Sequence, residues 1–81
     1  MSLPTPLYPA HIVVSTLKRQ VRVARTFEEQ NALRDAIDMI NIHGANRAMH
    51  MLYTLVCEPK LSPFSKRGYE TARDFLQIAG F

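Results

Sequence analysis

Residues 11–25 read HIVVSTLKRQVRVAR, and the conformation of this stretch decides whether the chain is mixed or all-helical. β-branched residues dominate it, as is typical of strands: Ile12, Val13, Val14, Thr16, Val21 and Val23. Its second half alternates apolar with polar side chains, the pattern of a half-buried strand. We therefore expect two short strands that form a β-hairpin, although residues 15–19 contain no Gly, Asn or Asp for a tight turn.

The same stretch also permits a helix. Its apolar residues Val13, Leu17, Val21 and Ala24 recur at intervals of three or four, which would place them on one helical face. The fold class that we predict is α+β, with an N-terminal extended arm and a β-hairpin packed on three α-helices. The alternative is an all-α fold with four helices.

The N-terminal segment is rich in proline. Residues 3–9 read LPTPLYP, and three prolines in seven residues exclude an internal helix and favour an extended, polyproline-like arm. We predict a single domain that comprises the whole chain, 1–81. Residues 1–10 would form the arm, 11–25 the hairpin and 26–81 the three helices.

The three helices are expected at about 27–43, 46–58 and 63–79. A capping box starts the first: the Thr26 hydroxyl can accept a hydrogen bond from the Glu29 amide, while the Glu29 carboxylate reaches the Thr26 amide. Gly44 ends it. The second is apolar around most of its circumference, so we expect it to be central. The third starts at Ser62, an N-cap followed by proline, and Gly80 closes it.

Size and composition narrow the class of protein. A core of 81 residues supplies only a few kcal/mol of stability unless it is shared with a partner. Cys57 is the sole cysteine, so no internal disulfide can form, and we expect a reducing compartment, the cytoplasm. The N-terminus lacks the pattern of a secretory leader. The longest apolar stretch, 48–57, is far shorter than the roughly 18 residues of a membrane span, so no membrane contact is predicted.

For each candidate catalytic group, a structural role explains the sequence better than a catalytic role. Cys57 lies on the apolar side of its predicted helix, where a free cysteine acts as a small buried hydrophobe. The three histidines do not show the spacing of a metal motif. Asp35 and Asp38 could pair for acid–base work, but their helix face is expected to be solvated. We therefore predict that the chain is no enzyme and binds no cofactor or metal.

The distribution of charge is the most distinctive feature. The net charge is +3, and four cations fall within residues 18–25, whereas the following predicted helix is acidic. We name six candidate residues for contact with a partner or with nucleic acid: Lys18, Arg19, Arg22, Arg25, Lys66 and Arg67. The competing interpretation is that charges on an exposed edge strand prevent aggregation.

We expect a small non-enzymatic protein that binds a partner protein as a regulator or inhibitor, of the kind encoded by phages and mobile elements. The alternative is a nucleic-acid-binding protein of the transcriptional regulator type that uses its basic edge. We also expect a two-fold homodimer, because a small core and a largely apolar second helix leave surface to cover. The residues predicted for self-association are Met49, Tyr53, Phe75 and Phe81. Alternatively, the N-terminal arm covers this surface and leaves a monomer.

Overall fold

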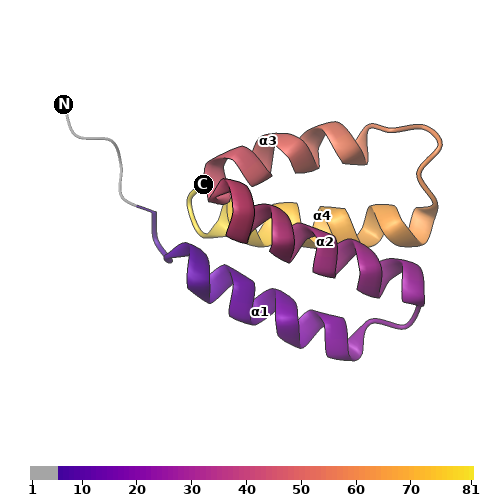
Figure 1. The fold of residues 1–81 in the computed structure, drawn as a ribbon, viewed down its shortest axis with the longest axis horizontal. Coiled ribbons are helices and arrows are strands. Elements are labelled where there is room, and N and C mark those ends of the chain that lie inside the picture. Colours follow the sequence, from indigo (N-terminus) through magenta and orange to yellow (C-terminus); the bar gives the residue numbers. More distant parts are fainter. Residues whose placement is uncertain (1–5) are drawn as a thin grey trace.

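A computed structural model describes residues 6–81, which contain four helices. In chain order these are α1 (Ala10–Val23), α2 (Phe27–His43), α3 (Ala45–Val56) and α4 (Pro63–Ile78). Successive helices alternate in direction, and α1 and α3 lie on opposite sides of the central α2–α4 pair (Figure 1). Over residues 6–81, none of the helices combines the length and the apolar character needed to cross a bilayer.

The predicted β-hairpin at 11–25 is wrong, because nearly all of this stretch belongs to α1. The all-α alternative with four helices is the one that fits. Val13, Val14 and Leu17 are buried on one face of α1, as the helical spacing of apolar residues required. β-propensity is a weak preference that packing overrides, and the stretch lacks the turn residues that a hairpin needs.

The part of the N-terminal arm at 1–5 lies outside the described residues. Pro6–Pro9 are not helical, and Pro9 precedes α1 with extended dihedral angles (φ −68°, ψ 158°). The backbone amide of Tyr8 donates to the carbonyl of Ala79, 3.3 Å away. Gly80 has a φ of +97°, and a Cβ there would lie 3.2 Å from the Leu7 nitrogen. The segment before α1 therefore packs against the C-terminal turn.

Each helix contributes one large, fully buried side chain to the core: Leu17, Leu33, Leu52 and Leu76. At Gly68, α4 approaches α2 closely. A Cβ at this position would lie 2.7 Å from the Cβ of Ala32 and 2.8 Å from the carbonyl oxygen of Glu29, both in α2. The absence of a side chain at Gly68 thus brings α4 close to α2.

The helix ends largely follow the predicted caps. The Thr26 hydroxyl accepts a hydrogen bond from the Glu29 amide at 3.1 Å, and Gly44, with a φ of +85°, separates α2 from α3. Two finer expectations fail. α2 and α4 each contact all three other helices, whereas α3 lies to one side of this pair and is peripheral. Cys57, which we expected to be buried, follows the last turn of α3 and is exposed.

Candidate functional site

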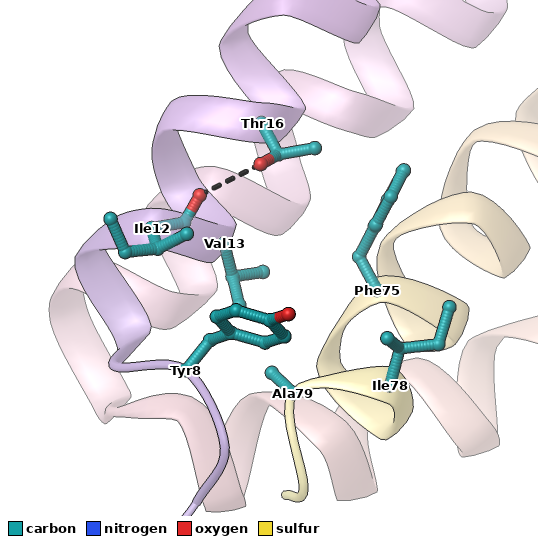
Figure 2. Close-up of a pocket in the computed structure, with 7 residues that line it drawn as sticks. All are labelled: Tyr8, Ile12, Val13, Thr16, Phe75, Ile78 and Ala79. Atoms are coloured by element: carbon teal, nitrogen blue, oxygen red, sulfur yellow. Dashed lines mark hydrogen bonds between the residues drawn. The ribbon is translucent and has the colours of Figure 1, made fainter.

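An apolar concave surface lies between α1 and α4, which we call the α1–α4 groove. Figure 2 shows seven residues around a pocket of about 260 Å³: Tyr8, Ile12, Val13, Thr16, Phe75, Ile78 and Ala79. None of them is charged. The residues come from the segment before α1, from the first two turns of α1 and from the end of α4.

Helical spacing and local hydrogen bonds explain this apolar lining. Ile12 and Thr16 are four residues apart and therefore lie on one face of α1. The Thr16 hydroxyl donates to the Ile12 carbonyl at 2.9 Å, so its polar hydrogen is already bonded within the helix (Figure 2). On α4, Phe75 and Ile78 are three residues apart and face α1. Tyr8 closes the end of the pocket, where its backbone amide bonds to Ala79.

Several apolar side chains around the α1–α4 groove are exposed to solvent. The exposed fraction is 52% for Tyr8, 41% for Ile12 and 62% for Ile78. Scattered exposed apolar residues are normal, but a cluster around a concave surface is typical of a contact site for another molecule. The groove therefore meets the physical requirements of a docking site.

The structure separates the basic residues that we predicted on the first segment. Lys18 and Arg22 line a depression between α1 and α2, and Arg34 of α2 joins them there, along with Asp38. Within residues 6–81 the structure forms one ion pair, between Arg73 and Asp74, so none of these three cations is paired.

The remaining predicted cations lie elsewhere. Arg19 is exposed on α1, and Arg25 is exposed in the turn that precedes α2. Lys66 and Arg67 are on the outer face of α4, in a depression that Glu70, Thr71 and Asp74 also line. Their surroundings therefore carry both signs of charge, rather than a second basic patch.

The residues predicted for self-association do not share one surface. Met49 is buried in the core, with 7% of its surface exposed. Tyr53 is exposed on α3, with the Arg73 guanidinium 5.5 Å from its ring centre. Phe75 lines the α1–α4 groove, and Phe81 is partly buried against the core. Of the four, Phe75 alone contributes to the groove.

The titratable groups show one marked perturbation. The Tyr69 hydroxyl donates to the Asp35 Oδ2 at 2.7 Å and thereby joins α4 to α2. Burial, then the hydrogen bond to Asp35 and the negative charge of its carboxylate, raise the pKa of Tyr69 to about 12. This contact joins two helices, and neither Tyr69 nor Asp35 lines the pocket of the α1–α4 groove. Across residues 6–81, no group of three His, Cys, Asp or Glu side chains is arranged to hold a metal ion.

Comparison with known proteins does not assign the chain to a family. The chain matches no protein-family model, and neither a curated protein nor a solved structure is significantly similar to it.

Two parts of the site were missed by sequence reasoning. The groove residues Tyr8, Ile12 and Ile78 belong to segments about sixty residues apart in the chain, and assigning 11–25 to strands removed the helical face on which Ile12 lies. The signal that could have located Ile12 was its four-residue spacing from Thr16, which places both residues on one face of a helix. Arg34 was missed because it is the single cation in residues 26–42, a segment with four acidic residues.

Proposed function

We propose that this protein is a non-catalytic docking module that binds another protein chain through the α1–α4 groove and thereby regulates or inhibits it. The observation that carries the proposal is the cluster of exposed apolar side chains around an uncharged pocket. Burying such a cluster against a partner gains about 25 cal/mol for each Å² of apolar surface removed from water. We place this function in the cytoplasm, because an exposed free thiol suits a reducing compartment.

The shape of the groove favours a helix as the docked element. Two helices with apolar residues at helical spacing form its walls, and an amphipathic helix presents a matching apolar face at intervals of three and four residues. One large side chain of the partner would fill the pocket beside Phe75, as anchor residues do in protein interfaces. The exposed rim of Tyr8 and Ile78 would then exclude water from the contact.

Affinity capture with matched variants tests this proposal. The immobilised chain is exposed to a lysate of its source cells, and retained proteins are identified by mass spectrometry. We expect Ile12→Glu and Ile78→Glu to abolish retention, since a charge at either position would be desolvated on docking. Ile42→Glu is the control, because Ile42 is an exposed isoleucine on α2 outside the groove. Equal retention by all three variants would refute docking at the groove.

Nucleic-acid binding is a second candidate function, favoured by the convergence of Lys18, Arg22 and Arg34 from two helices. Three unpaired cations could contact consecutive phosphates. Affinity for duplex DNA would then fall with salt, with a log–log slope of about −0.9 for each phosphate neutralised.

A titration with fluorescent duplex and single-stranded oligonucleotides tests the second candidate. Arg22→Glu and Arg34→Glu should each weaken binding, whereas Arg47→Glu, at an exposed arginine of α3, should have little effect. Absence of binding at low salt would remove this candidate.

A further inference from the structure

The outer face of α4 carries a stripe of residues that repeats every seven positions. Phe64, Thr71 and Ile78 follow one another at intervals of seven residues. Arg67 and Asp74 are also seven residues apart, and they come three residues after Phe64 and Thr71 respectively. Seven residues complete two helical turns with a drift of only about 20°, so Phe64, Thr71 and Ile78 form one row along the helix. Arg67 and Asp74 form a second row beside it, offset by about 60° around the helix axis. We call these two adjacent rows the α4 stripe.

The α4 stripe is accessible. Phe64 is 50% exposed and Ile78 is 62% exposed, although both are large apolar residues. Arg67 and the two acidic residues Glu70 and Asp74 line the same shallow depression. Asp74 contacts Arg73 through its Oδ1 atom, which leaves Oδ2 free, and 58% of its side chain is exposed.

The order of charges along the stripe makes it complementary to itself when it is reversed. Within the stripe, Arg67 lies toward the start of α4 and Asp74 lies toward its end, whereas Glu70, beside the stripe, is at the middle of the helix. We propose that the partner at the α1–α4 groove is a second copy of this chain, whose α4 stripe packs antiparallel against the first about a two-fold axis near Thr71.

The register follows from the spacing. An axis at Thr71 places Phe64 of one copy level with Ile78 of the other, so that an apolar pair closes each end of the contact. It also places Arg67 within one residue of the level of Asp74, an axial offset of about 1.5 Å that an arginine side chain spans easily. Each dimer would thus contain two Arg67–Asp74 ion pairs and two apolar pairs.

A two-fold interface has to be self-complementary, because each copy uses the same surface. The antiparallel arrangement of the α4 stripe meets this condition. In a parallel arrangement, Arg67 would face Arg67 and Asp74 would face Asp74, and like charges in an interface are unfavourable. Because Ile78 belongs both to the stripe and to the groove, this inference rests on the proposed docking function and names its occupant.

Charge reversal tests the pairing. The dissociation constant of the dimer is measured by sedimentation and light scattering for the full chain and for Arg67→Asp, Asp74→Arg and the double variant. Each single change should weaken the dimer on the order of a hundredfold, because it creates two like-charge contacts. The double variant should recover most of the affinity, since exchanged charges pair equally well.

The fold itself should tolerate these changes. An acidic residue near the start of α4 and a basic residue near its end both suit the helix dipole, and the exposed Arg73–Asp74 pair contributes little. Circular dichroism on each variant checks this. Arg47→Asp makes the same change of charge on α3, away from the stripe, and should leave the dimer intact.

Every outcome decides the question. A mass of 9.2 kDa at all concentrations overturns the second copy as the occupant, while the lysate capture still tests docking of another protein. A dimer that is insensitive to both single changes forms elsewhere on the surface. If the losses of dimer affinity from the two single changes add in the double variant, the Arg67–Asp74 pairing is excluded. Recovery in the double variant confirms it.

Cysteine cross-linking tests the direction of the two helices, in a Cys57→Ser background that removes the exposed native thiol. Thr71→Cys lies beside the axis and should form an intermolecular disulfide on mild oxidation. Phe64→Cys should remain uncoupled, because in the antiparallel register its counterpart lies at the far end of the contact. Efficient coupling at Phe64→Cys would indicate a parallel dimer and would overturn the proposal.

Discussion

Tyr69 is the residue whose chemistry the fold changes most. Its hydroxyl donates to Asp35 at 2.7 Å and stays protonated to a higher pH than in an unfolded chain, with its pKa raised from 10.0 to about 12. A pKa that is higher in the folded state means that folding binds a proton at alkaline pH. The contribution of this group to stability is therefore complete below pH 10 and is lost as the pH rises through 12.

We predict that Tyr69→Phe lowers the free energy of unfolding by about 1 kcal/mol at neutral pH, the usual effect of one lost hydrogen bond. The variant should also lose the part of the alkaline decline between pH 10 and 12 that belongs to this tyrosine. Urea unfolding followed by circular dichroism at several pH values measures both effects. Tyr53→Phe keeps the Tyr69 hydroxyl and should decline as the native chain does.

Gly68 shows how one missing side chain sets the distance between two helices. A Cβ there would be 2.8 Å from the Glu29 carbonyl oxygen, a backbone atom that cannot rotate away. We predict that Gly68→Ala destabilises the protein by about 1–3 kcal/mol through overpacking, despite the higher helix propensity of alanine. Urea midpoints measure this, with Lys66→Ala on the exposed side of α4 as the control. A stability equal to that of the native chain would contradict the close approach.

Among the elements, α2, α3 and α4 could be located from their ends. Thr26, Gly44 and Ser62 are residues whose local hydrogen bonds or dihedral angles act as start and stop signals regardless of tertiary contacts. α1 has no such signal apart from Pro9, and its N-cap makes no side-chain hydrogen bond. Its many β-branched residues therefore favoured the wrong element, although the burial of Val13 and Leu17 follows helical spacing.

The Thr26 cap can be tested directly. Thr26→Ala should lower the free energy of unfolding by about 1 kcal/mol, because the Glu29 amide loses the hydroxyl that it contacts at 3.1 Å. Thr26→Ser keeps a hydroxyl in the same place and should have nearly native stability. Thermal melts of the two variants under identical conditions measure the difference. If both variants melt at the same temperature, the cap contributes nothing.

For the molecule as a whole, the helix assignments alone do not reveal the docking site. The α1–α4 groove is formed where residues 8–16 meet residues 75–79, and that meeting depends on how four helices pack. Phe75 and Met49 were both predicted to lie on a contact surface, yet Met49 is a core residue, because apolar spacing alone does not show which face of a helix remains exposed. The cluster of basic residues could not be predicted either, because Arg34 meets Lys18 and Arg22 only through the packing of α2 on α1.

The four buried leucines indicate that all four helices unfold together. We predict that Leu17→Ala costs about 2–5 kcal/mol, a large share of the stability of so small a domain. Val23→Ala, on the same helix but 69% exposed, should cost at most about 0.5 kcal/mol. Unfolding is followed by circular dichroism and by tyrosine fluorescence. A mild effect of Leu17→Ala would mean that α1 is not part of the cooperative core.

The exposed position of Cys57 has a practical consequence. It is the sole thiol of the chain, and it follows the last turn of α3. α3 ends at the end of the molecule opposite the start of α1 (Figure 1), and residues at the start of α1 line the groove. A nitroxide spin label attached there would leave the groove untouched. In frozen solution a two-fold dimer would give a single dipolar distance between its two labels, while a monomer would give only a featureless decay. The native chain can therefore report its own assembly by electron paramagnetic resonance without any substitution.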